Sequence, residues 1–238
     1  MISNSAPWDN LKYDSDGITE VSHKLFSTLY NTYSFFALYA NVDGFTGDEP
    51  EVPVQERPEI DRWILSLLNT LVDECTQALD DYEPTRAARA IGDFVNDNLS
   101  NWYVRLNRKR FWGGEMTTDK LAAYQTLYTC LCTIARLMAP VSPFFSDRLY
   151  RDLTGAESVH LALWPEVDRA LIDKDLERHM ATAQTVTSMV LALRRKVNIK
   201  VRQPLSTLLI PEAAGVDTSL PASIRDLVLA EVNIKDIK

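Results

Sequence analysis

Apolar residues recur every three or four positions along most of residues 22–155, a spacing that places them on one face of a helix. The pattern predicts five helices separated by turn-forming segments such as Asp43-Gly44 and the proline-rich stretch 46–58. We expect these helices to begin near Ser22, Ile60, Pro84, Thr117 or Thr118, and Ser142. Five helices with short connections indicate a helical bundle.

The apolar faces of these helices predict the centre of the bundle. Its expected core consists of Trp63, Leu67, Leu71, Ile91, Val95, Leu99, Trp102, Leu131 and Ala135. The first helix should present Leu25, Leu29, Tyr33, Phe36 and Ala40 to this core.

The pattern changes after Gly155. Residues 159–163 are short and apolar enough for an extended segment, and a long helix is expected over 173–196. A strand over 205–210, a last helix from Pro221 and an alternating edge strand over 232–237 complete the prediction. The fold class is therefore mainly α, a helical bundle at 23–155 followed by a small α+β unit at 156–238.

Composition is that of an ordinary globular protein, with 238 residues of which 46% are hydrophobic and 24% charged. No run approaches the roughly 20 apolar residues that span a bilayer, and the first residues lack the basic and apolar regions of a signal peptide. Cys75, Cys130 and Cys132 lie inside apolar helical patterns, which favours reduced, buried thiols. We expect a cytoplasmic protein without a membrane partner.

Signatures of catalysis are missing from the sequence. It contains no glycine-rich phosphate loop, no nucleophile elbow and no spacing typical of metal ligands. The three histidines, His23, His160 and His179, are far apart and have no cysteine or acid cluster beside them. We therefore predict no catalytic residue, no metal site and no independent enzyme.

Charge is distributed unevenly along the chain. The net charge is −8, but residues 104–113 and 194–202 contain nine cations and no acid, so the remainder sums to −17. Local potential rather than total charge governs where a polyanion binds. Two solvated helix ends would explain the same pattern without any partner.

The first basic segment predicts a distinct exposed face. On a helical wheel, Leu99, Trp102, Tyr103 and Leu106 fall together and should pack inward. A second group falls on another face, and it consists of Arg105, Arg108, Lys109 and Trp112. Cations can contact phosphates, and an indole can stack on an unpaired base. Alternatively, Trp112 plugs the end of the bundle while the cations extend from its surface.

The second basic segment ends the long predicted helix. Val186, Val190, Leu193 and Val197 are expected to face inward, whereas Arg195 and Lys196 point elsewhere. Lys200 and Arg202 alternate along an expected extended segment, which would place both on one side. Cations at a helix C-terminus also complement the helix dipole, although this does not explain Lys200 and Arg202. Arg110, in the first segment, falls on the inward side and should pair with an acid.

Five segments have a distinctive wording, and they are Asn31–Asn41 (NTYSFFALYAN), Arg57–Ser66 (RPEIDRWILS), Asn101–Gly114 (NWYVRLNRKRFWGG), Met138–Phe145 (MAPVSPFF) and Arg202–Leu205 (RQPL). Together they resemble isoleucyl-tRNA synthetases, in register over essentially the whole chain. The family's His-Ile-Gly-His and Lys-Met-Ser-Lys-Ser signatures are absent, and Pro7–Leu11 resembles the sequence that follows the second of them. Residues 1–22 would then be the tail of a catalytic domain, and the chain an excised piece truncated within its C-terminal unit.

The resemblance implies an anticodon-binding part of an isoleucine–tRNA ligase. It would hold tRNA(Ile) for ATP-dependent aminoacylation by the absent catalytic domain, which would use ATP and Mg²⁺. The piece alone would be inactive, without a cofactor, and monomeric. The residues expected to contact tRNA are Arg105, Arg108, Lys109, Trp112, Arg195, Lys196, Lys200 and Arg202. The alternative is a helical scaffold that binds protein and not RNA.

Overall fold

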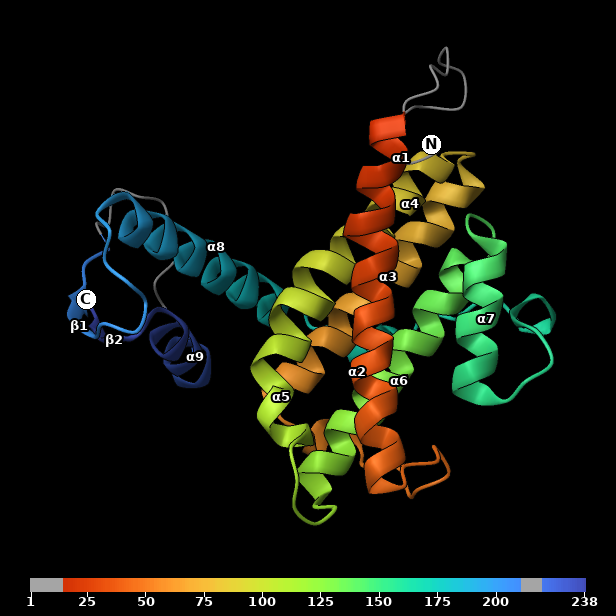
Figure 1. Cartoon of the computed structure of the whole chain (residues 1–238), viewed down its shortest axis with the longest axis horizontal. Helices are drawn as coiled ribbons and strands as arrows, with labels where there is room; N and C mark the ends of the chain where they lie inside the picture. The colour runs from red at the N-terminus through yellow and green to blue at the C-terminus, as the bar shows by residue number, and fades with distance from the viewer. Residues whose placement is uncertain (1–14, 211–219) are drawn as a thin grey trace. The chain divides into compact units, whose positions relative to one another are not determined.

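A computed structural model describes residues 15–210 and 220–238, and the chain divides into two compact units with the boundary between Ile172 and Asp173 (Figure 1). Residues 1–14, which include most of the expected catalytic-domain tail, lie outside the described residues. The fold is mainly α, as predicted, with a small two-stranded sheet.

Helices make up most of the first unit. They are α1 (Ser15–Val21), α2 (Ser27–Asp43), α3 (Glu59–Asp80), α4 (Pro84–Asp93), α5 (Arg105–Phe111), α6 (Thr118–Met138) and α7 (Pro143–Thr154). Two π-helical segments, η1 (Ser22–Phe26) and η3 (Phe94–Val104), join α1 to α2 and α4 to α5. Three short 3₁₀ turns complete the unit, and they are η2 (Val54–Glu56), η4 (Val159–Leu161) and η5 (Arg169–Leu171).

Local sequence explains where these helices begin and end. Pro84 occupies the first turn of α4, where its missing N–H costs no hydrogen bond. The Thr117 side chain caps α6 by accepting a hydrogen bond from the Lys120 backbone N–H. Gly44 and Gly155 end α2 and α7 with positive φ angles, which glycine adopts without a steric penalty. Helical structure starts at Ser15, earlier than the predicted start near Ser22.

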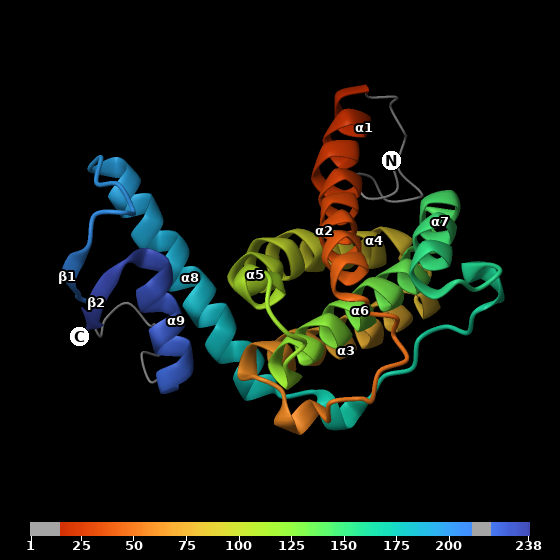
Figure 2. The same cartoon turned by 60° about the horizontal axis from the view of Figure 1, so that its bottom comes forward.

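The core of the first unit lies between α3, α6 and the long α4–η3–α5 segment. Figure 2 shows α6 beside α3 with α2 crossing α6, and contacts between the same helices agree. Of the nine predicted core residues, eight are buried, including Trp63, Leu99 and Leu131. Leu67 is only half-buried, because it lines a surface groove between α3 and α4.

The segment from 156 to 172 packs against the bundle and clusters with the first unit, whereas the sequence pattern predicts a boundary after Gly155. Trp164 Nε1 donates a 2.9 Å hydrogen bond to Thr76 Oγ1, and the Asp168 backbone N–H donates to Asn69 Oδ1 at 2.8 Å. Expected extended structure at 159–163 is replaced by the η4 turn, so that prediction was wrong. Long-range hydrogen bonds to α3 decide the course of this segment.

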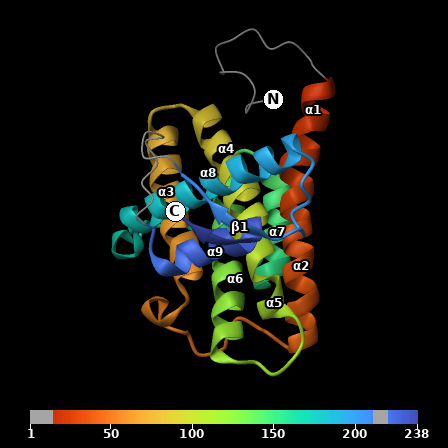
Figure 3. The ribbon, with the colours of Figure 1, turned by 90° about the vertical axis from the view of Figure 1, so that its left-hand side faces the viewer.

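The second unit contains α8 (Lys174–Lys196), β1 (Leu205–Leu208), α9 (Ala222–Val232) and β2 (Ile234–Ile237), seen together in Figure 3. β1 and β2 pair in parallel, with Leu205 opposite Ile234. Met180 and Val190 of α8 and Val228 and Val232 of α9 are buried. The elements match the predicted order, although Val232 ends α9 and does not begin the strand.

Candidate nucleic-acid interface

Helix α5 presents the first basic segment. Arg105, Arg108 and Lys109 are exposed, and the indole of Trp112, just beyond the helix, has 54% of its surface accessible. Arg105 Nε also donates to the Asn101 carbonyl one turn earlier, which restrains that side chain. Three cations and one aromatic ring are thus available on the surface of one short segment.

The opposite side of this segment is anchored in the core. Leu99, Trp102 and Tyr103 are buried, as the helical wheel predicted, whereas Leu106 is half-buried. Phe111 is fully buried and makes an edge-to-face contact with Tyr124, with ring centroids 4.9 Å apart. Consecutive aromatic residues therefore have opposite roles, because Phe111 fixes the end of α5 and Trp112 remains accessible.

A buried ion pair fixes the orientation of α5. Arg110 forms a two-point contact with Asp61, whose side chain is fully buried, at 2.6 and 2.9 Å. The Tyr103 hydroxyl donates to the same carboxylate at 2.8 Å, and Asp119 accepts a further bond from Arg110 Nε at 3.0 Å. The prediction that Arg110 pairs with an acid is confirmed.

Electrostatics agree with this geometry. Burial would lower the pKa of Arg110, but the hydrogen bonds and charge of Asp61 outweigh burial and raise that pKa above its usual range. Burial, followed by the negative charge of Asp61, raises the pKa of Tyr103 well above its ordinary value. Arg110 is therefore charged and Tyr103 is a hydrogen-bond donor at neutral pH.

A second buried pair holds the loop that follows α5. Lys120 Nζ lies 2.6 Å from Asp43 Oδ2 and donates to the Gly113 carbonyl at 3.1 Å. The Tyr124 hydroxyl donates to the same Asp43 carboxylate. Burial would raise the pKa of Asp43, but the Lys120 and Tyr124 hydrogen bonds lower it. These contacts tie the loop after Trp112 to both α2 and α6.

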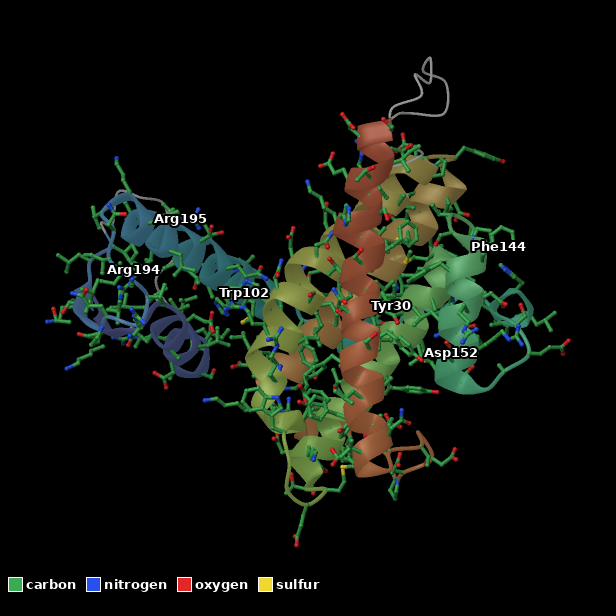
Figure 4. The ribbon with its side chains drawn as sticks, viewed as in Figure 1. Tyr30, Trp102, Phe144, Asp152, Arg194 and Arg195 are labelled. Carbon is green, nitrogen blue, oxygen red and sulfur yellow. The ribbon has the colours of Figure 1, made fainter. Side chains whose placement is uncertain are left out.

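The second basic segment lies at the end of α8, in the other unit. Arg195, Lys196, Lys200 and Arg202 are exposed. Arg194 is only 3% exposed, and Figure 4 labels it beside Arg195. Of the nine cations in the two segments, Arg110 and Arg194 therefore face the interior or its edge.

Arg194 organises the chain after α8. Its guanidinium donates to the backbone carbonyls of Lys200, Gln203 and Asn233 at 3.2, 3.0 and 3.0 Å. The Gln203 N–H donates to the Lys200 carbonyl, so residues 200–203 form a turn. The predicted extended segment with Lys200 and Arg202 on one side was wrong, because these contacts bend the chain.

The predicted inward face of α8 needs a second correction. Val186 and Val190 are buried, but Leu193 and Val197 are about 60% exposed. Arg194 takes the inward position that follows them, at a spacing of four residues. The spacing is visible in the sequence, but periodicity does not predict burial for an arginine, because charged side chains are almost never fully buried without a partner.

The described residues offer little other chemistry. No group of three or more histidine, cysteine, aspartate or glutamate side chains within residues 15–210 and 220–238 is placed to hold a metal ion. Burial raises the pKa of Cys75 to about 12 and that of Cys132 to about 12, so both thiols stay protonated at neutral pH. No described helix is long and apolar enough to cross a membrane.

Comparison with known proteins identifies close relatives. The chain is 64% identical to an isoleucine–tRNA ligase of Porphyromonas gingivalis, 65% to one of Bacteroides thetaiotaomicron and 55% to one of Cytophaga hutchinsonii. All of this chain is aligned in each case, but it covers 21%, 21% and 22% of those proteins. The chain thus spans about a fifth of the length of these relatives.

A family model describes the same region more directly. Residues 61–209 match the anticodon-binding domain of tRNA ligase. This match begins at Asp61, the carboxylate that orients α5, and includes both basic segments. It covers more than half of the chain, and the chain therefore belongs to the family of anticodon-binding domains of tRNA ligases.

Proposed function

We propose that this chain binds the anticodon arm of tRNA(Ile) and positions it for aminoacylation by the catalytic part of an isoleucine–tRNA ligase. The observation that carries the proposal is the accessible row of Arg105, Arg108, Lys109 and Trp112 on α5, within a chain of this family. The proposal takes isoleucine as the amino acid because the most similar relatives reported above are isoleucine–tRNA ligases.

Each of these side chains has a definite role in the proposal. Arg105, Arg108 and Lys109 contact phosphates, which position the RNA without reading its sequence. Trp112 stacks on an unpaired base, because the anticodon loop exposes bases that are not in a duplex. Arg110 does not contact RNA but holds α5 in place through Asp61.

The second unit contributes a separate set of contacts. Arg195, Lys196, Lys200 and Arg202 are the proposed phosphate ligands there, all exposed near the end of α8. No acid interrupts residues 194–202. These cations support RNA binding because they neutralise phosphates and release the counterions that surround a nucleic acid.

The activity of the whole ligase follows from the same proposal. It joins isoleucine to tRNA at the expense of ATP with Mg²⁺, in a cytoplasmic protein. This chain binds RNA and catalyses no reaction of its own. It acts as a monomer. Isoleucine-dependent exchange of pyrophosphate into ATP by the isolated chain should stay at the level of a blank, and exchange above that level would contradict this division of roles.

A salt titration tests the proposal against a helical scaffold that binds only protein. Affinity for tRNA(Ile) should fall steeply between 50 and 200 mM salt, because each phosphate contact contributes roughly 0.7–0.9 to the log–log slope. A tRNA with another anticodon, measured in parallel, separates anticodon recognition from general RNA binding. Absence of tRNA binding at 50 mM salt would favour the scaffold.

A further inference from the structure

A pocket of about 460 Å³ lies at the end of α8, entirely within the second unit. Its volume is within the range of about 300–1,000 Å³ that is typical of small-ligand sites. The lining residues are Leu191, Arg194, Arg195, Asn198, Ile199, Lys200 and Val201. They combine aliphatic walls, one amide and three cations, a mixture that suits a ligand with both an apolar face and a negative charge.

The charge of the pocket comes partly from a buried cation. Arg194 is 3% exposed, and its described hydrogen-bond partners are the carbonyls of Lys200, Gln203 and Asn233. Its Nε is buried and has no hydrogen-bond acceptor. Carbonyl dipoles satisfy donors but carry no net charge, so the positive charge of Arg194 is not neutralised by these partners. An anion in the pocket would provide that neutralisation.

Arg194 also shapes the pocket. Its bonds to the Lys200 and Gln203 carbonyls close the turn that places Lys200 and Val201 on the pocket wall. Asn198 reverses the chain at a positive φ of 56°, and Asn233 Nδ2 donates to the Val201 carbonyl at 2.9 Å. The backbone around the pocket is thus held from both α8 and the end of α9.

We infer that this pocket receives one unstacked nucleotide of a bound RNA, with its base against Ile199 and Val201 and its phosphate on Arg195 and Lys200. Extruded bases are commonly held between apolar side chains, and cations bind the phosphate. The Asn198 amide can donate to and accept from a base edge, which a purely electrostatic contact could not do. Arg194 is a positioning residue in this arrangement. The inference rests on the proposed RNA binding and assigns a specific part of the RNA to this unit.

Nuclear magnetic resonance of the whole chain tests the pocket with 5′-AMP, adenosine and inorganic phosphate. The backbone amides of Asn198, Ile199 and Val201 should shift with 5′-AMP, and at least about tenfold higher concentrations of the two partial ligands should be needed. Equal responses to 5′-AMP and phosphate would overturn the base contact. Equal responses to 5′-AMP and adenosine would overturn the phosphate contact, and no shift at all would overturn the site.

Variants that leave Arg194 intact separate binding from folding. Lys200→Gln should weaken 5′-AMP binding roughly tenfold, since a charged hydrogen bond is lost. Val201→Asn removes an apolar wall at similar size without a change in charge and should also weaken binding. Lys235→Gln, an exposed cation on β2 outside the pocket, is the matched control. Unchanged binding in both pocket variants would overturn the inference.

The same variants distinguish this inference from the proposed function. If wild-type chain binds tRNA but Lys200→Gln and Val201→Asn do not alter that binding, the pocket assignment fails and the proposed function stands. If 5′-AMP binds in the pocket while tRNA does not bind at all, the proposed function fails.

Discussion

Each of the two basic segments turns one arginine inward, but the partners of the two arginines differ. In α5, Arg110 turns inward and meets the carboxylates of Asp61 and Asp119. At the end of α8, Arg194 turns inward and meets three backbone carbonyls. Each segment therefore uses one cation for its own structure, and a count of basic residues overestimates how many can contact RNA.

The partner of the inward arginine determines the electrostatic environment that each segment offers to a ligand. A carboxylate cancels the charge of Arg110, so the positive potential at α5 comes from the outward side chains of Arg105, Arg108 and Lys109. Carbonyl groups leave Arg194 charged, so its field adds to that of Arg195 and Lys200 around a hollow. The first segment suits contacts along an extended RNA strand, and the second suits a single group seated in an open hollow.

The largest expected effect is loss of the α5 support. Asp61→Ala should cost about 3–5 kcal/mol in the free energy of unfolding, because it leaves Arg110 buried without its main partner and Tyr103 without its acceptor. Urea unfolding measures this cost. Asp119→Ala, whose side chain is 54% exposed, is the control and should cost about 0–1 kcal/mol. Similar costs in the two variants would show that Asp61 is not the main support.

A smaller loss is expected at the end of α8. Arg194→Met keeps an apolar stem of similar length but removes all three hydrogen bonds to carbonyls, which should cost about 1–3 kcal/mol. Arg195→Met, at an exposed neighbouring position, should leave unfolding nearly unchanged. If the Arg194 variant is as stable as wild type, the contrast between carboxylate and carbonyl partners loses its energetic basis.

Trp112→Ala should weaken tRNA binding by about 1–3 kcal/mol, since one stacked base loses its aromatic partner. The salt dependence should stay nearly the same, because stacking releases no counterions. Phe144→Ala is a suitable control, since this ring on α7 is 91% exposed in the same unit. An equal loss in both variants would indicate a general effect of surface aromatics.

Exposed cations should affect binding and barely affect folding. Replacing Arg105, Arg108 and Lys109 by Gln should lower the log–log salt slope of tRNA binding by roughly two units, at about 0.7 per phosphate contact. Stability should change by about 0–1 kcal/mol per residue.

The matched control for this triple variant removes the same charge elsewhere in the unit. Gln at Arg148, Arg151 and Arg169, each paired with a nearby acid, should leave the slope unchanged. A slope that drops equally in both variants would mean that overall charge, and not the α5 face, sets the affinity.

Much of the fold could be predicted because apolar spacing is a local property. The helix expected to begin near Ile60 is α3, Glu59–Asp80, and Thr117, one of the two threonines at which the next helix but one was expected to begin, caps α6. The exposed face of α5 followed from the same wheel, as did the acid partner of Arg110. Contact of that face with RNA remains a prediction.

Features that depend on distant residues could not be predicted in the same way. The course of residues 159–171 depends on hydrogen bonds to Thr76 and Asn69, which lie 88 and 99 residues before their partners in the chain. The turn at Lys200 is held by Arg194 together with the end of α9. The alternation of Lys200 and Arg202 with apolar residues is also typical of extended structure, so the sequence pattern there predicts the wrong conformation. Periodicity contains no information on such partners.

Because Arg110 is paired with Asp61, only the outward cations of α5 attract RNA in this segment. This has a consequence for the rate at which RNA and protein associate. An RNA strand that diffuses toward this chain meets a molecule of net charge −8, and attraction is confined to small areas such as the outward side of α5. From most directions, the negatively charged protein surface repels the RNA, so only a narrow range of orientations leads to a complex. Association should therefore be orientation-selective and should slow as ionic strength rises, whereas the dissociation rate should depend mainly on close contacts such as Trp112.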